Sequence, residues 1–168
     1  FSHTLLESSY QFIWMIVQTE ENYKITLDRG FDLVGLTKRQ RKRAQRMEPE
    51  DRVLFYISGL RKWAASAYIE SECFEDDEII WQSIGSRDER YPYRAKIRKG
   101  ISLKPDKYIN GLELGPTLEY TKRWSPKLWY LAFVDTIHLL PQRDFNLIEN
   151  EMRRTLKKKL ITVKASDE

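Results

Sequence analysis

The residues best suited to bind a ligand stand between Ile79 and Arg94. Trp81 follows two β-branched apolar residues and indicates the end of a strand, and Tyr91-Pro92-Tyr93-Arg94 opens the next strand. Aromatic rings at the mouth of a sheet, beside an arginine, suit a flat partner of modest negative charge. A nucleobase attached to a phosphate is such a partner, because every base has a π-face and every nucleotide carries an anion. The segment therefore predicts a base-stacking site centred on Trp81.

Polar side chains are expected at the same mouth. Residues 12–17 form a continuous apolar run, typical of a strand buried on both faces. Gln18, Thr19 and Asn22 follow it, where this strand meets a helix expected over residues 20–29, and their amides and hydroxyl can hydrogen-bond a base edge. Tyr56 and Ser58, at the end of a later strand, are placed beside them. The alternative is that Trp81 is a core residue and Asn22 a helix-turn residue.

A second feature is a basic run of helical propensity that puts six cations into nine residues. These are Lys38, Arg39, Arg41, Lys42, Arg43 and Arg46. On a helix so many cations cannot share one face, so they repel one another unless an anion is present. We expect them to contact phosphates, independently of base sequence and with a strong salt dependence. Arg87, Arg90, Arg94 and Lys96 would extend the track; the alternatives are a solvated helix and, for Arg94, a structural ion pair.

Composition sets the class of protein. The chain has 168 residues, 41% hydrophobic and 32% charged, which predicts one folded domain and excludes a disordered chain. A net charge of +4 favours polyanionic partners. The single cysteine, Cys73, excludes an internal disulfide and fits a reducing cytoplasm, the expected location. No apolar run approaches the roughly 20 residues of a membrane span, so no membrane partner is expected.

Signatures of catalysis are weak. His3 and His138 lie far apart in the chain, and the seven glycines are scattered singly rather than gathered in a phosphate-binding loop. The acidic residues 75–78 could hold a metal, but they are more typical of a solvated turn. We therefore predict no enzyme activity, no catalytic residue, no metal and no cofactor. Two rival interpretations remain: an enzyme acting on a nucleotide or small aromatic substrate, and a protein-interaction module.

The pattern of elements predicts a mixed α/β domain. Strands are expected over residues 12–17, 52–58, 62–72 and 93–103, and helices over 20–29, 38–46, 104–110 and 141–160, with a loop at 31–37. The last helix carries an apolar stripe behind Pro141. Together they predict a curved sheet of about five or six strands with helices on its flanks. Residues 1–10 are expected as a lead-in, 11–160 as the domain and 161–168 as a tail.

An ordered set of residues resembles an EVE domain over residues 12 to 152. The set is Trp14, Asn22-Tyr23, Gly35, Pro49 to Val53 with Phe55-Tyr56, Ile80-Trp81, Tyr91 to Arg94, Arg123 to Ser125, and Leu140-Pro141 with Asp144-Phe145. The resemblance implies a PUA-like, partly closed β-barrel similar to YTH domains. It also implies a nucleic-acid-binding module that flips a modified base into an aromatic pocket, with modified cytosine in DNA expected and N6-methyladenine or modified RNA as alternatives. EVE domains occur fused to modification-dependent restriction enzymes, so a nuclease is an implied fusion or partner.

The chain departs from the family pattern at one pocket wall. The usual Trp-Gly pair after the first helix is Val34-Gly35 here, so either Val34 forms a non-aromatic wall or Phe31 takes its place. The family pattern also places Trp124 near the pocket rim, the alternative being that it anchors the C-terminal helices. The predicted pocket is Gln18, Thr19, Asn22, Phe31, Val34, Gly35, Tyr56, Ser58, Trp81, Tyr91, Tyr93 and Trp124. The predicted phosphate contacts are Lys38, Arg39, Arg41, Lys42, Arg43 and Arg94.

Overall fold

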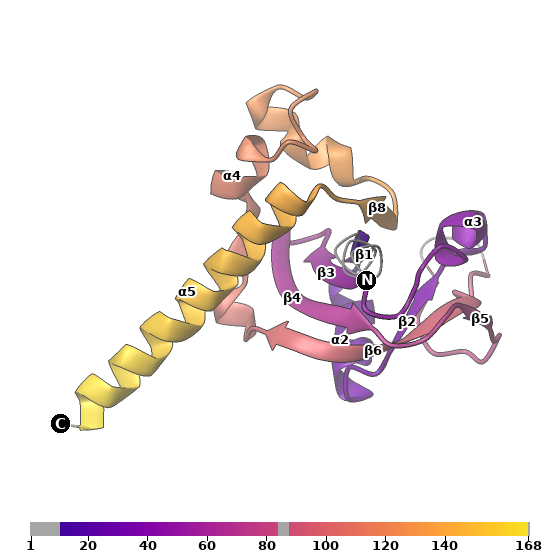
Figure 1. Ribbon diagram of the computed structural model, residues 1–168, viewed down its shortest axis with the longest axis horizontal. Coiled ribbons are helices and arrows are strands. Elements are labelled where there is room, and N and C mark those ends of the chain that lie inside the picture. The colour runs from indigo at the N-terminus through magenta and orange to yellow at the C-terminus, as the bar shows by residue number, and fades with distance from the viewer. Residues whose placement is uncertain (1–10, 84–87, 168) are drawn as a thin grey trace, which may run out of the picture.

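A curled sheet forms the centre of the molecule (Figure 1), seen in a computed structural model that describes residues 11–83 and 88–167. Its six principal strands run in the order β2-β6-β4-β3-β1-β8, and β5 and β7 pair with β6 and β4. The strands are β1 Ile13–Gln18, β2 Leu33–Leu36, β3 Arg52–Ile57, β4 Lys62–Ile69, β5 Phe74–Glu75, β6 Tyr93–Ser102, β7 Ile109–Asn110 and β8 Ile137–Leu139. β1 and β3 are parallel, and the other pairings are antiparallel. The predicted partly closed sheet flanked by helices is confirmed.

The central strands are buried on both faces, as predicted for the first apolar run. Alternate residues of β1 and β3 point to opposite sides of a sheet. Trp14 and Phe55 belong to the core that includes Tyr23, on the helix α2 Glu20–Asp28. Met15 and Tyr56 belong to a second core, shared with the C-terminal helix α5 Gln142–Asp167. This alternation decides which side chains of each strand can reach a site on the α2 side of the sheet.

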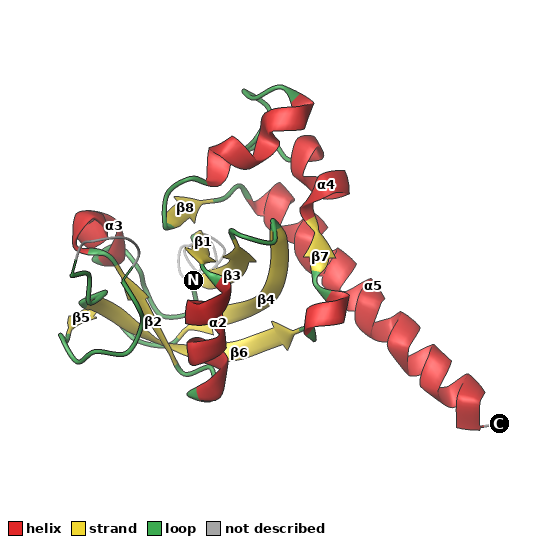
Figure 2. Cartoon of the chain, turned by 180° about the vertical axis from the view of Figure 1, so that it is seen from behind, coloured by secondary structure: helices red, strands yellow, loops and turns green. Residues whose placement is uncertain are grey.

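The remaining helices are short. Thr19 caps α2 by accepting a hydrogen bond from the Asn22 amide at 3.2 Å, as its position before two glutamates indicates. The basic run forms the 3₁₀ turn η1 Lys38–Gln40 and one turn of α-helix, α3 Arg41–Ala44. The others are η2 Pro105–Lys107, α4 Gly111–Leu114, η3 Gly115–Thr117 and η4 Pro126–Phe133. In Figure 2, α2 lies across the strands of the sheet.

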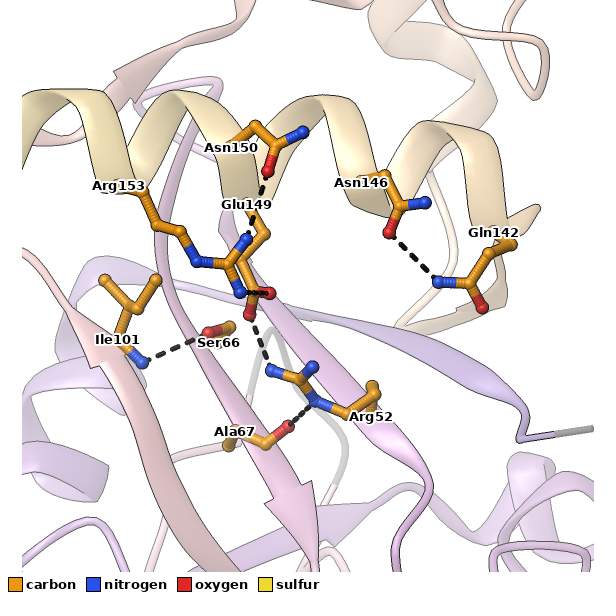
Figure 3. Close-up of polar contacts among 9 residues, drawn as sticks. All are labelled: Arg52, Ser66, Ala67, Ile101, Gln142, Asn146, Glu149, Asn150 and Arg153. Carbon is orange, nitrogen blue, oxygen red and sulfur yellow. Dashed lines mark hydrogen bonds and ion pairs between the residues drawn. The ribbon is translucent and has the colours of Figure 1, made fainter. Parts of the chain in front are cut away.

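A buried ion pair fastens α5 to the sheet (Figure 3). Arg52 of β3 donates to a Glu149 carboxylate oxygen at 2.6 Å, and Arg153 binds the other oxygen at 2.6 Å. Arg52 also donates to the carbonyl of Ala67 on β4 at 3.4 Å. Beyond this anchor, α5 continues away from the body of the domain (Figure 1). Residues 161–167, expected as part of a tail, prolong that helix.

Other boundaries also differ from the prediction. The expected loop at 31–37 contains β2, paired with β6. Trp81, expected at a strand end, lies in an irregular segment between β5 and β6. Residues 104–110 form η2 and β7 in place of a short helix, and β8 was not expected. The expected lead-in 1–10 lies outside the described residues.

Candidate nucleic-acid interface

A small polar-lined cavity lies where β1 ends and α2 begins. Six of the predicted pocket residues line it together with Ile16, Val17 and Thr136. The six are Gln18, Thr19, Asn22, Gly35, Trp81 and Tyr91. The free volume is about 20 Å³, which is room for one water molecule and not for a base.

Trp81 is tightly packed beside this cavity. Its side chain is 2% exposed and packs with Tyr91 in an edge-to-face contact, with ring centroids 6.0 Å apart. Its indole Nε1 donates to the Thr26 hydroxyl at 3.0 Å. A Cβ placed on Gly35 would stand 2.4 Å from the Trp81 ring, so the indole lies directly on the bare backbone of β2. Trp81 is therefore a wall of the cavity and, in this conformation, also its plug.

Asn22 holds the Trp81 segment in place. Its side-chain amide donates to the Gln82 carbonyl at 3.0 Å, and its amide oxygen accepts from the Gln82 N–H at 2.8 Å. The Tyr91 hydroxyl lies 3.4 Å from the same carbonyl and from the Asn22 amide nitrogen. Burial raises the pKa of Tyr91, and the Glu89 carboxylate raises it further, so the phenol remains a proton donor. The Asn22 side chain, which was predicted to hydrogen-bond a base edge, is therefore already bonded to the backbone of the Trp81 segment.

One polar group of the cavity has no partner. The Thr136 hydroxyl oxygen is buried and makes no hydrogen bond in the structure. Gln18, by contrast, donates to the Thr26 hydroxyl at 3.2 Å. A buried hydroxyl without a partner costs about 1–3 kcal/mol. Thr136 therefore lines the cavity with a hydroxyl whose hydrogen-bonding capacity is unused in this structure.

Three predicted pocket residues lie in the cores instead. Successive residues of β2 face opposite sides, so Val34 points into the α2 core while Gly35 meets Trp81. Phe31 also lies in that core, 4.9 Å from the Phe55 ring centroid. Tyr56 faces the α5 side and packs on Trp63 and Phe133. None of the three lines the cavity in this structure, so neither Val34 nor Phe31 forms a wall of it here.

The last three predicted pocket residues also lie away from the cavity. Ser58 is exposed after β3, where its amide donates to the Gln18 carbonyl at 3.1 Å. Tyr93 is half-buried against the α2 core. Trp124 is 42% exposed in the loop before η4, in a different groove. The rim position expected for Trp124 is therefore not what the structure shows.

Arg94, predicted as a phosphate contact, is engaged by the protein itself in this structure. Its side chain is fully buried, 5.4 Å from the centre of the Trp81 ring. It donates to the carbonyls of Tyr91 and Arg90, each at 3.0 Å, and to that of Glu78. Asp76 pairs with it at 3.4 Å, which gives the acidic turn an ion-pairing role. Its donors therefore stabilise the segment that carries Trp81.

The other predicted phosphate residues lie on an exposed surface next to the cavity. Lys38, Arg39, Arg41, Lys42 and Arg43 are all exposed. Those from 39 to 43 line a shallow groove of about 530 Å³ together with Asp135, the neighbour of Thr136 in sequence. Neighbouring residues, 135 and 136, therefore line the groove and the cavity.

Two of these cations already have partners. Arg39 pairs with Asp135 at 3.1 Å, and Arg43 donates to the Ile137 carbonyl at 2.8 Å. Of the residues expected to extend the track, Arg90 pairs with Asp88 at 3.7 Å and Lys96 is exposed. Arg87 lies outside the described residues.

Sequence reasoning missed Thr26 and Thr136. Thr26 is fully buried and links Trp81 to Gln18. Its spacing of four from Asn22 places both on one helix face, a signal that could have found it. Thr136 directly precedes β8, a strand of three residues that carries too short a pattern to be recognised.

Two features are absent from the described part of the chain. Among residues 11–83 and 88–167, no group of three or more histidine, cysteine or acidic side chains is placed to hold a metal. In the same part, no helix combines the length and apolar character needed to cross a bilayer.

Known structures share this architecture. The YTH domain of the Zygosaccharomyces rouxii MRB1 protein, solved with N6-methyladenosine RNA, superimposes with a TM-score of 0.61 at 16% identity, covering 85% of this chain and 87% of that one. This is the fold of the YTH domains. The Pho92 YTH domain, solved with m6A, gives 0.61 at 18% identity, covering 83% and 82%. A hypothetical protein from Leishmania major gives 0.59 at 12% identity, covering 90% and 98%.

Sequence comparison adds no closer relative. No family model matches the chain, and no curated protein matches it. The YTH-like fold is thus established by structure, and the EVE resemblance agrees with it only at the level of the fold.

Proposed function

We propose that this domain binds single-stranded nucleic acid and accommodates one modified base beside Trp81. The observation that carries the proposal is that neighbouring residues, 135 and 136, line two features: a cavity walled by Trp81 and Tyr91, and a groove lined by cations. A base can stack on the indole while phosphates bind in the groove. Binding requires no catalytic group, so we propose a reader and not an enzyme.

The size of the cavity sets a condition on this function. About 20 Å³ cannot hold a base, so the Trp81 ring must leave its place against Gly35 as the base enters. Asn22 and Arg94 hold the backbone of the segment that carries Trp81, so their hydrogen bonds limit how far this segment can move. Extruding the base costs a few kcal/mol of stacking as well. Stacking on the indole and hydrogen bonds to the base edge must offset both the displacement of the Trp81 ring and the extrusion of the base.

The comparisons favour one ligand for a first test. Two YTH domains of the same fold were solved with N6-methyladenosine, one of them in RNA. That supports N6-methyladenine in RNA ahead of the modified cytosine in DNA that the EVE resemblance implies. Both belong in the experiment, because the identity of the fold does not determine the base.

The test compares short single-stranded oligonucleotides that differ at one central base, by fluorescence anisotropy. We expect tighter binding of an RNA carrying N6-methyladenosine than of its adenosine twin, with 5-methylcytosine DNA and its cytosine twin as the second pair. Trp81→Phe keeps a smaller ring and should retain part of the preference. Trp81→Leu should lose it, because base–aromatic stacking is worth about 1–3 kcal/mol.

Folding must be checked in parallel, since Trp81 is buried and its loss also removes packing. Circular dichroism and a urea midpoint for each variant separate binding from unfolding. A folded Trp81→Leu protein that still prefers the modified strand would show that the cavity is not the reading site.

A further inference from the structure

An exposed tryptophan stands apart from the other four. Trp14, Trp63, Trp81 and Trp129 are each at most 2% exposed, whereas Trp124 is 42% exposed. Within the described residues, no second ring packs on it. A large amphipathic ring left in water is a frequent mark of a binding surface. Trp124 therefore needs an explanation that packing does not provide.

The segment around Trp124 is rigidly built. The carboxylate of Asp144, at the start of α5, accepts hydrogen bonds from the backbone amides of Glu119 and Tyr120, each at 2.9 Å. The buried Thr121 hydroxyl donates within the same turn, and the Trp124 amide donates to the Thr121 carbonyl at 3.0 Å. The ring is thus presented by a pre-organised loop, which lowers the entropic cost of binding.

The groove beside this ring is cationic. Trp124 lines a groove of about 490 Å³ with Lys122, Arg123 and Tyr120. Lys122 pairs with Glu119 at 3.3 Å, but within the described part of the chain no hydrogen bond or ion pair engages the side chain of Arg123. An aromatic face beside a free guanidinium matches a base with its adjoining phosphate.

Hydrogen bonds link this groove to the proposed interface. The Tyr120 hydroxyl lies 2.7 Å from Nδ1 of His138, whose Nε2 lies 2.8 Å from the Asp135 carbonyl. Tyr120 lines the Trp124 groove, and Asp135 lines the basic groove. Tyr120 therefore stands between the Trp124 groove and the basic groove of residues 39–43.

From this arrangement we infer that the Trp124 groove is a second nucleotide-binding site, where an unpaired base of the bound strand stacks on Trp124 and its phosphate binds Arg123. The inference rests on the proposed function, because it needs a strand already held in the basic groove. The site contributes affinity without reading the base, since stacking tolerates every base. The occupant is single-stranded nucleic acid; a partner protein is the competing outcome.

The experiment uses the full chain and the same RNA pairs, long enough to pass beyond the modified base, together with the free modified nucleoside. Trp124→Ala should weaken binding of modified and plain RNA alike, by about 5- to 150-fold. The ratio between the two strands should not change, and neither should affinity for the nucleoside. Trp124→Phe should keep most of the affinity, and Arg123→Gln should weaken both strands and reduce the salt dependence.

Leu112→Ala is the matched control, because Leu112 is 65% exposed and lies outside this groove. Since Trp124 is the single exposed tryptophan of the five, acrylamide quenching of fluorescence gives a direct readout: bound RNA should protect it. The inference would be overturned if Trp124→Ala bound RNA with wild-type affinity and bound RNA left the fluorescence of the wild-type protein unprotected. It would also be overturned if a protein ligand, but not RNA, protected that fluorescence. A Trp124-dependent affinity with no preference for modified strands would instead refute only the modified-base part of the proposed function.

Discussion

Replacing Gly35 by alanine is the most direct test of how the cavity is built. The added Cβ would lie 2.4 Å from Cζ3 of Trp81, 2.9 Å from Cε3 of the same ring, and 2.9 Å from the Tyr91 Cβ. Contacts below 3 Å cannot persist, and β2 cannot retreat because it is paired with β6. The ring must therefore shift, at the cost of about 1–3 kcal/mol typical of overpacking. For a domain of this size that corresponds to a fall in Tm of about 2–12 °C.

The assay is urea unfolding followed by circular dichroism, with acrylamide quenching of the folded protein. Gly59→Ala is the matched control, because a Cβ there meets nothing within 4 Å, and it should be neutral or stabilising by about 0.4–1 kcal/mol. Gly35→Ala should also increase quenching, since the buried indole is displaced toward solvent. Equal stability of the two variants, with quenching unchanged, would refute the packing of Trp81 on Gly35.

Three further predictions concern single groups. Thr136→Val should leave stability unchanged or raised, because its hydroxyl has no partner, and should weaken modified-strand binding by about 0.5–1.5 kcal/mol in the anisotropy assay. Arg41→Ala and Lys42→Ala, both exposed, should each weaken modified and plain strands equally and reduce the slope of log K against log salt by about 0.7–0.9. Burial lowers the pKa of His138, so below the unfolded-state pKa near 6.5 the unfolded chain binds the extra proton. Stability is then fully present above that pH and falls as pH drops toward the folded-state pKa, a trend that urea titrations should detect and His138→Phe should remove.

The sequence predicted the centre of the fold because its local patterns are strong there. The apolar run before Gln18 is typical of a strand buried on both faces, and Thr19 followed by two glutamates indicates a helix start. β2 and β8 were missed for the opposite reason. Each has three or four residues, and β2 is held by pairing with β6 and not by a periodic pattern of its own.

Part of the site could be predicted, and the reasons are the same as for the fold. A strand end and a helix start must adjoin, so Gln18, Thr19 and Asn22 were placed together correctly. The sequence could not show that Val34 and Gly35 face opposite sides, because the strand itself was not recognised. Arg94 shows a further limit. Its partners are mainly backbone carbonyls of an irregular segment, and nothing in the order of residues specifies where those carbonyls point.

The packed state of Trp81 bears on how selective such a site can be. A base entering against Gly35 replaces one buried aromatic surface with another, so the free energies of apolar burial largely cancel. The Trp81–Thr26 hydrogen bond, worth about 0.5–1.5 kcal/mol, is lost. An unmodified base therefore gains little from entering. A methyl group adds about 0.8 kcal/mol of apolar burial, which is a preference of roughly fourfold. A measured preference well above that value would require a hydrogen bond specific to the modified base, and the unpartnered hydroxyl of Thr136 is the group in the cavity that is free to make it.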